Sequence, residues 1–270
     1  MTDSAEYARL LASGHLLRRG VMAGLVELLG VAAGQRVLDV GCGSGLVSAM
    51  LWDVVGPRGL VAGLDFNPGL LALAPGNAPG ALFVHGDGHD LPFARSEFDL
   101  VLSVDCAGYP AAGRQAMVDQ LREFGRALRP GGRAALAAWT SQRLLPGHAE
   151  LEARLNLTTQ GLAPYKRGMA ADAVFDRGLG WLRSAGYREA SMHVLAGTVQ
   201  GPLDPEQRAA MLDLFFMRWG GSLGELGRSA RAEYEALTRA DSRTCILDEP
   251  DYAAFFTYTV FTGRWGAMRP

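Results

Sequence analysis

Hydrophobic positions in the first sixty residues follow two different periods. Residues 5–30 carry leucine and valine at helical spacing and predict one or two amphipathic helices. The run from Arg36 to Val40 is short and largely β-branched or apolar, it ends in glycines, and a helical pattern through Val47, Met50 and Leu51 follows it. This succession predicts a first β-α unit.

Further short apolar runs repeat the pattern and alternate with helix-like segments. Such alternation is typical of parallel strands that are joined by helical crossovers. The sequence therefore predicts five strands of a doubly wound sheet. The four additional runs occupy residues 60–64, 81–84, 98–103 and 133–139.

Glycine and proline mark the connections that follow. The motif Arg129-Pro130-Gly131-Gly132 predicts a turn between a helix that ends near Leu128 and the fifth strand. Residues 140–172 are polar and interrupted by glycine and proline, so they predict a connection between elements. Residues 176–185 then predict a last crossover helix, which Gly186 closes.

The remaining pattern predicts strands at 189–199 and 254–265, with a helical insertion at about 205–240 between them. We expect this insertion to cap the active site. Its apolar residues lie nearly all round a helix, which fits packing against the sheet or a partner subunit, or an apolar pocket that includes Trp139 and Tyr165. The apolar residues of the insertion are Met211, Leu212, Leu214, Phe215, Phe216, Met217 and Trp219.

Composition and charge narrow the class of protein. The 270 residues are 49% hydrophobic and 20% charged, as in an ordinary globular protein. The formal net charge of −2 provides no broad positive field of the kind that attracts nucleic acid. We therefore expect no nucleic-acid partner.

The N-terminus and the cysteines point to a reducing, cytoplasmic setting. The first residues are polar and acidic, where a secretory signal places positive charge before an apolar run. No stretch approaches the roughly 18 apolar residues of a membrane span. Cys42, Cys106 and Cys245 are far apart, so they predict neither a disulfide framework nor a metal site.

A glycine-rich turn follows the first strand in the sequence Asp39-Val40-Gly41-Cys42-Gly43-Ser44-Gly45. Glycine at Gly41, Gly43 and Gly45 lets the backbone approach a ligand closely. A nicotinamide dinucleotide and S-adenosylmethionine are the competing ligands. The dinucleotide fingerprint needs a small residue where this chain has Leu46, and Asp39 would repel a pyrophosphate but favour a cationic sulfonium. The sequence therefore favours S-adenosylmethionine.

With this turn, the chain resembles the class I S-adenosylmethionine-dependent methyltransferases, in particular the small-molecule branch similar to ubiquinone and menaquinone biosynthesis enzymes. Asp65, at the end of the second strand and twenty residues after Gly45, is spaced to accept both ribose hydroxyls. The resemblance implies that Asp87 accepts the adenine amino group. The predicted cofactor residues are Asp39, Gly41, Gly43, Gly45, Asp65, Phe66, Asp87, Gly88, Val104 and Arg19, the last of these, or its neighbour Arg18, for the cofactor carboxylate.

No motif identifies a catalytic base. The named candidates are Tyr109 and His148, with Asp105 and His193 behind them, and a structural role is the more frequent one for each type. Cys106 has no paired histidine and fits a small buried residue better than a nucleophile. The stretch 104–110 also departs from the Pro-rich aromatic motif of nucleic-acid amino-group methyltransferases.

Together these features predict an α/β, Rossmann-like, doubly wound and mostly parallel seven-stranded sheet with a helical cap insertion. The expected activity is methyl transfer to oxygen, nitrogen or carbon of a small, apolar metabolite, with a homodimer through the insertion possible in principle. A catalytically silent S-adenosylmethionine-binding protein and a nicotinamide-dependent oxidoreductase are the alternatives. The expected divisions are a helical segment over the cofactor site at 1–30, the core at 31–203, the cap at 204–250 and the final core strand at 251–270.

Overall fold

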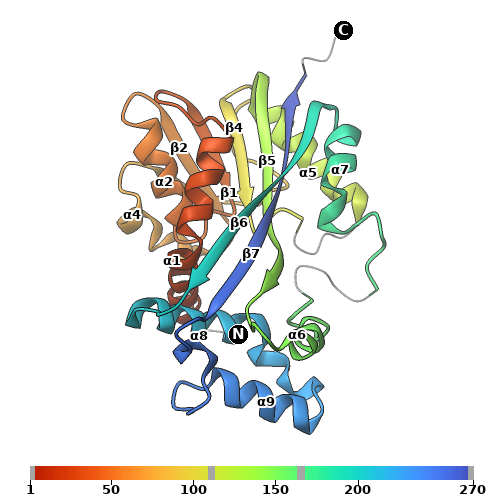
Figure 1. Cartoon of the computed structure of the whole chain (residues 1–270). Coiled ribbons are helices and arrows are strands. Elements are labelled where there is room, and N and C mark those ends of the chain that lie inside the picture. The colour runs from red at the N-terminus through yellow and green to blue at the C-terminus, as the bar shows by residue number, and fades with distance from the viewer. Residues whose placement is uncertain (1–3, 109–112, 163–167, 267–270) are drawn as a thin grey trace. The chain divides into compact units, whose positions relative to one another are not determined.

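The computed structural model describes residues 4–108, 113–162 and 168–266. Within those ranges, seven strands form a single sheet in the order β3-β2-β1-β4-β5-β7-β6 (Figure 1). This arrangement confirms the predicted sheet. The strands are β1 (Arg36–Val40), β2 (Leu60–Asp65), β3 (Leu82–His85), β4 (Phe98–Val104), β5 (Leu128–Arg143), β6 (Tyr187–Gln200) and β7 (Ala253–Trp265).

The helices alternate with the strands through the first half of the chain, as the periodicity predicts. A single continuous helix precedes β1, in agreement with the one or two helices that were expected there. The helices are α1 (Ser4–Leu28), α2 (Leu46–Val55), α3 (Pro68–Leu71), α4 (Ala74–Asn77), α5 (Arg114–Ala127), α6 (Ala149–Asn156), α7 (Gly178–Ala185), α8 (Pro205–Trp219) and α9 (Arg228–Thr238).

The direction of winding reverses between β1 and β4. The chain runs outward from β1 to β2 and β3, and then returns to place β4 and β5 on the other side of β1. These neighbouring strands are parallel, and right-handed crossovers in opposite directions put α2 and α5 on opposite faces of the sheet. The carboxyl ends of β1 and β4 therefore form a topological switch point, where α/β sheets bind ligands.

The last strand departs from the parallel arrangement. In Figure 1 the arrow of β7 points opposite to the arrows of β5 and β6. The sheet is therefore mostly parallel, in agreement with the prediction.

The chain divides into two compact units. The core unit comprises Met22–Trp139, Gly168–Leu195 and Tyr258–Pro270, and the second unit comprises Met1–Val21, Thr140–Arg167 and Ala196–Thr257.

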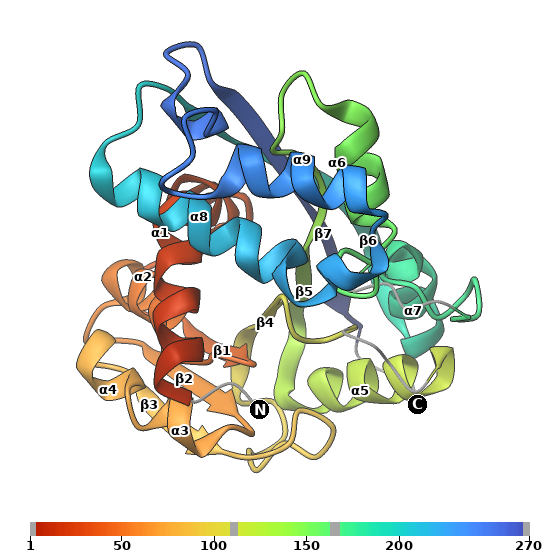
Figure 2. The same cartoon turned by 90° about the horizontal axis from the view of Figure 1, so that it is seen from below.

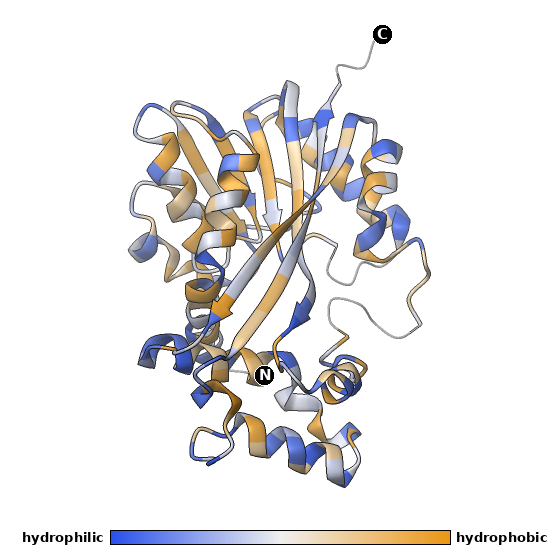
Figure 3. Ribbon diagram, in the orientation of Figure 1, coloured by the Kyte–Doolittle hydropathy of each residue, from blue (hydrophilic) through white to orange (hydrophobic). Residues whose placement is uncertain are grey.

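Apolar residues from strands and helices fill the interior of the core unit. Figure 3 shows hydrophobic residues along its central strands. Phe98 on β4, Phe124 on α5 and Trp181 on α7 have no exposed surface. Burial of such large side chains contributes about 2–3 kcal/mol each, so this layer anchors α5 and α7 beside the sheet.

The insertion of the second unit is helical, as predicted, and α8 lies beside α9 (Figure 2). Trp219 stacks with Phe215 at 6.0 Å and meets Tyr234 edge-on at 6.1 Å. The Tyr234 hydroxyl also donates to the Phe215 carbonyl. Packing therefore accounts for Phe215 and Trp219, whereas Phe216 is 57% exposed.

Two local predictions are wrong. The motif at 129–132 does not separate a helix from a strand, because it lies inside β5, where the register shifts and Gly131 has a φ of 82°. The connection predicted at 140–172 instead contains the end of β5 and helix α6. In that segment Glu152 is fully buried and accepts hydrogen bonds from the Leu144 and Leu145 amides.

Among the described residues, none of the helices combines the length and the hydropathy that crossing a membrane requires.

Candidate functional site

The glycine loop after β1 has a backbone that only glycine adopts readily. Gly41, Gly43 and Gly45 have φ values of 79°, 55° and 80°, all in the left-handed region. Space is also limited, because a Cβ on Gly41 would overlap the Cys106 side chain. The loop thus presents bare backbone at the switch point, immediately before α2.

Asp65 connects the end of β2 to this loop. One carboxylate oxygen accepts a 2.8 Å hydrogen bond from the Gly43 amide, and the other accepts a 2.8 Å hydrogen bond from the Asn67 amide. Asp65 is 6% exposed. Since each carboxylate oxygen has two lone pairs, both oxygens retain capacity to accept from a further donor.

Asp39 lies beneath the loop, with 1% of its surface exposed. Its carboxylate accepts a 2.6 Å hydrogen bond from the Ser48 hydroxyl of α2. The pKa of Asp39 is raised to about 6, mainly because the carboxyl is buried; the Ser48 hydrogen bond opposes this rise and the nearby Asp65 charge adds to it. Asp39 is therefore ionised above that pH and provides a negative charge under the loop.

The segment after β3 lies at the same edge of the sheet, since His85 pairs with Asp65. Asp87 is exposed and accepts hydrogen bonds from the His89 amide and ring, which lower its pKa. A Cβ on Gly88 would come within 2.9 Å of the Val40 side chain. Phe66 is 73% exposed. These predicted residues thus gather near the ends of β1 and β2.

The end of β4 carries a network that the sequence did not reveal. Asp105 directly follows Val104 and has a left-handed φ of 51°. Its carboxylate accepts a 2.9 Å hydrogen bond from the Trp139 amide and a 2.6 Å hydrogen bond from the Tyr258 hydroxyl. The Ser103 hydroxyl donates to the Val40 carbonyl, which ties β4 to β1.

Both cysteines near the loop are protonated thiols. Burial raises the pKa of Cys106 to about 11, and it raises the pKa of Cys42 well above its ordinary value. A thiol in this state is a poor nucleophile. Within the described ranges, no group of three metal-ligating side chains occurs either. The interpretation of Cys106 as a small packing residue therefore fits the structure.

The candidate bases have structural partners of their own. His148 immediately precedes α6, and its Nδ1 lies 2.9 Å from Glu233. His193 Nε2 lies 3.1 Å from the Ser191 hydroxyl. Tyr109, like the expected pocket residue Tyr165, falls outside the described residues. Arg19 is exposed on α1 in the second unit.

Comparison with known proteins supports the resemblance. Residues 37–132 match the family model described as a methyltransferase domain. The matched segment contains the loop, Asp65, Asp87 and Asp105, and it ends at Gly132 within β5.

Two curated relatives are demethylmenaquinone methyltransferases. That of Listeria welshimeri is 35% identical over 127 residues, which is 45% of this chain and 52% of the relative. That of Staphylococcus aureus is 35% identical over 121 residues, which is 44% of this chain and 48% of the relative. The chain thus spans about half the length of the curated relatives that it matches.

Solved structures confirm the fold. The YcgJ protein of Bacillus subtilis covers 92% of this chain and 99% of its own, with a TM-score of 0.54 at 16% identity. Phosphoethanolamine N-methyltransferase 2 of Haemonchus contortus, solved with S-adenosyl-L-methionine, gives a TM-score of 0.54 at 15% identity over 92% of this chain and 53% of its own.

Proposed function

We propose that this protein is an S-adenosylmethionine-dependent methyltransferase that acts on a small, apolar metabolite. The observation that carries the proposal is the switch-point loop, in which three left-handed glycines lie above Asp39 and are tied to Asp65. The methyltransferase-domain match over residues 37–132 supports it.

The residues at the loop suit the chemical groups of this cofactor. The bare backbone at Gly41, Gly43 and Gly45 admits close approach, and the buried charge of Asp39 favours a cationic ligand. We assign the ribose hydroxyls to the free lone pairs of Asp65.

The predicted adenine site follows β3 and β4. We assign the adenine amino group to Asp87, whose exposed carboxylate can accept a further hydrogen bond. Gly88, Phe66 and Val104 would border the base. The assignment of Arg19 to the cofactor carboxylate rests on the sequence alone.

The cofactor supplies a methyl group that is already electrophilic when bound to a sulfonium. The protein's own task is then to align the acceptor and exclude water. A general base is needed only where the acceptor loses a proton. We assign that task to Asp105, which follows the end of β4 and whose carboxylate is oriented by the Trp139 amide and the Tyr258 hydroxyl.

A quinone-like ring is the acceptor class that the relatives suggest, since two of them act on demethylmenaquinone.

We further propose that the helical segment at 204–250 provides the apolar pocket. Its Phe216 offers a test, because more than half of its surface is exposed and Phe216→Ser leaves the buried Phe215 and Trp219 in place. We expect a higher KM for the acceptor with unchanged cofactor affinity, whereas the equally exposed Leu157→Ser should change neither. A homodimer and a cytoplasmic location belong to the proposal on sequence grounds only.

Calorimetric titration with S-adenosylmethionine, S-adenosylhomocysteine and NADH tests the cofactor. We expect micromolar binding of the first two and none of NADH, followed by transfer of labelled methyl to a demethylmenaquinone analogue. NADH binding alone would instead support an oxidoreductase. Binding without transfer to any quinone, phenol or amine acceptor would support a silent binding protein.

A further inference from the structure

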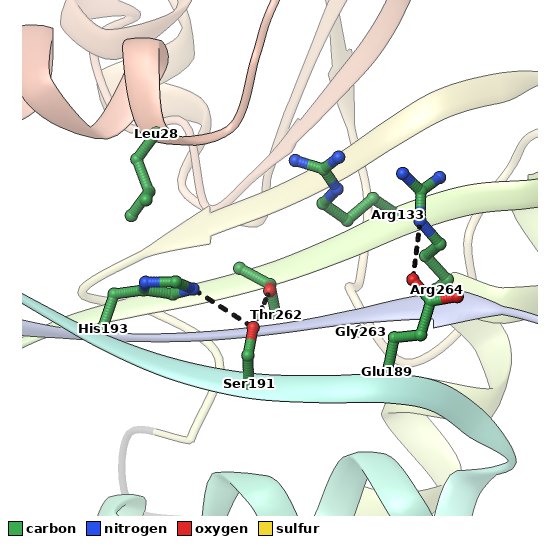
Figure 4. A pocket seen from close by; sticks show the side chains of 8 residues that line it. All are labelled: Leu28, Arg133, Glu189, Ser191, His193, Thr262, Gly263 and Arg264. Atoms are coloured by element: carbon green, nitrogen blue, oxygen red, sulfur yellow. Dashed lines mark hydrogen bonds and ion pairs between the residues drawn. The ribbon is translucent and has the colours of Figure 1, made fainter.

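A polar pocket lies on the sheet of the core unit, beside the end of α1 (Figure 4). It measures about 210 Å³ and is lined mainly by side chains of β5, β6 and β7. Its lining residues are Leu28, Arg133, Glu189, Ser191, His193, Thr262, Gly263 and Arg264. Nothing in the proposed methyl transfer uses these residues.

Positive charge in the pocket exceeds negative charge. The guanidinium groups of Arg133 and Arg264 extend from neighbouring positions above the sheet (Figure 4). Arg264 forms an ion pair with Glu189 at 3.1 Å. Arg133 donates only to the Leu29 carbonyl, at 2.7 Å, and has no carboxylate partner among the described residues. Burial and repulsion from Arg264 lower the pKa of Arg133, and the charge of Glu189, which makes no ion pair with Arg133, only partly opposes them.

Hydroxyl groups complete the lining. The Ser191 hydroxyl lies 2.9 Å from the Thr262 hydroxyl and 3.1 Å from the His193 ring. Thr262 is 8% exposed, and the hydrogen bond with Ser191 holds its hydroxyl in place. The pocket therefore combines a guanidinium that has no carboxylate partner with a pair of hydroxyls that can offer one proton to a ligand.

The register places this pocket away from the glycine loop. Arg133 pairs with Leu100, and Leu100 pairs with Val37. Val37 lies three residues before Val40, about 10 Å along a strand. The pocket thus belongs to the amino half of the parallel strands, whereas the loop follows their carboxyl ends.

We propose that this pocket binds a small oxyanion, either a phosphate monoester or a carboxylate. Arginine binds both groups through paired, charge-assisted hydrogen bonds. An oxyanion beside Arg133 would supply the missing counter-charge and relieve its repulsion from Arg264. The hydrogen-bonded hydroxyls of Ser191 and Thr262 use one proton between them and would add one neutral donor. The site is independent of methyl transfer, so neither proposal depends on the other.

Titration of the full chain with inorganic phosphate, and separately with sodium acetate, tests the site at constant ionic strength set by chloride. The readouts are binding heat and the ring NMR signals of the five histidines. We expect saturable binding in which His193 signals move and the other histidine signals stay. The anion that binds more tightly identifies the phosphate or the carboxylate class.

Matched variants locate the binding. Arg133→Gln should weaken binding at least tenfold, whereas Arg58→Gln, which removes the same charge from an exposed position outside the pocket, should not. Ser191→Ala, with a smaller change in volume, should weaken it a few-fold and serves if Arg133→Gln fails to fold. Absence of saturable binding of both anions, or equal binding by the wild type and both pocket variants, would overturn the proposal.

Discussion

The Tyr258 hydroxyl donates a 2.6 Å hydrogen bond to Asp105 across 153 positions of the sequence. This contact joins the last strand to the residue that directly follows β4. Tyr258 has no exposed surface, and its ring meets Trp139 edge-on at 5.9 Å. The left-handed backbone of Asp105 is thus held from two neighbouring strands at the edge of the sheet that carries the candidate site.

Removal of the Tyr258–Asp105 hydrogen bond should lower the free energy of unfolding by more than removal of a tyrosine hydrogen bond to a neutral carbonyl. Tyr258→Phe deletes a bond to a carboxylate and should lower the free energy of unfolding by about 2 kcal/mol. Tyr252→Phe is the matched control, because Tyr252 is equally buried but donates to the Leu144 carbonyl, and it should cost about 1 kcal/mol. Urea unfolding of the two variants measures the difference. Equal costs would mean that the charge of Asp105 contributes nothing.

Gly41 should be less tolerant of a side chain than a left-handed glycine that has room for a Cβ. Gly41→Ala incurs backbone strain and an overlap with Cys106, whereas Gly186→Ala incurs strain alone, because the nearest atom to its Cβ lies at an ordinary contact distance of 3.8 Å. We expect a loss of about 1 kcal/mol for Gly186→Ala and a clearly larger loss for Gly41→Ala. Thermal unfolding checks the stabilities, and titration checks that only Gly41→Ala impairs binding of S-adenosylmethionine.

Asp65 should contribute strongly to cofactor affinity. If Asp65 binds the ribose hydroxyls as proposed, Asp65→Ala removes a pair of charge-assisted hydrogen bonds, and we expect a loss on the order of 2 kcal/mol in binding. Asp53→Ala, on the exposed surface of α2, is the control for loss of a negative charge. Calorimetry with S-adenosylhomocysteine measures both variants. An affinity equal to the wild type would contradict the ribose assignment.

Loss of the Gly43 contact is the competing explanation for a weak Asp65→Ala variant. The thermal unfolding curve of the free protein separates the two. If the variant only loosens the loop, the midpoint of thermal unfolding and the cofactor affinity should fall together. If Asp65 contacts the ribose directly, the affinity should fall by more than the loss of stability explains.

The local hydrophobic pattern was sufficient to predict an element whose structure depends mainly on its own residues. The strand at Arg36–Val40 and the loop glycines follow from a short apolar run and the backbone needs of a tight turn. The motif at 129–132 has the composition of a turn, but its structure depends on β4, which pairs with β5 on both sides of it. The partner strand lies about thirty residues away in sequence, so local reasoning could not include it.

The residues of the candidate site could be named from the sequence, but the hydrogen bonds between them could not. Asp39 and Asp65 stand out because of their spacing to the glycines, yet their burial and their bonds to Ser48 and Gly43 depend on packing. Helix α6 was missed because buried Glu152 interrupts the apolar pattern that marks a helix face. The partnership of Asp105 with Tyr258 has no local signal at all, since strand order alone brings the two residues together.

Asp39 should make stability and cofactor binding respond to pH in opposite directions. Its pKa is about 6 in the folded protein and 3.8 as an ordinary carboxyl, so the folded state holds this proton more tightly. Between these two values the folded state binds more protons than the unfolded state, and the contribution of Asp39 to stability falls as the pH rises. Above pH 6, where Asp39 is ionised in both states, its burial lowers the free energy of unfolding by about 3 kcal/mol at most.

Asp39→Asn removes that cost while preserving an acceptor for Ser48, so we expect a more stable free protein at pH 7.5 and the same stability as the wild type near pH 4.

The affinity for S-adenosylmethionine should respond to pH in the opposite way. In the wild type the affinity should fall as the pH drops through about 6, because protonation of Asp39 removes the charge beneath the loop. In Asp39→Asn the affinity should be low at every pH. Exposed Asp251→Asn is the control and should reproduce the wild type in both measurements. If Asp39→Asn were less stable than the wild type at pH 7.5, the buried charge would be compensated by the fold, and its place beneath the loop would be structural. A retained pH dependence of affinity in that variant would instead assign the titration to another group.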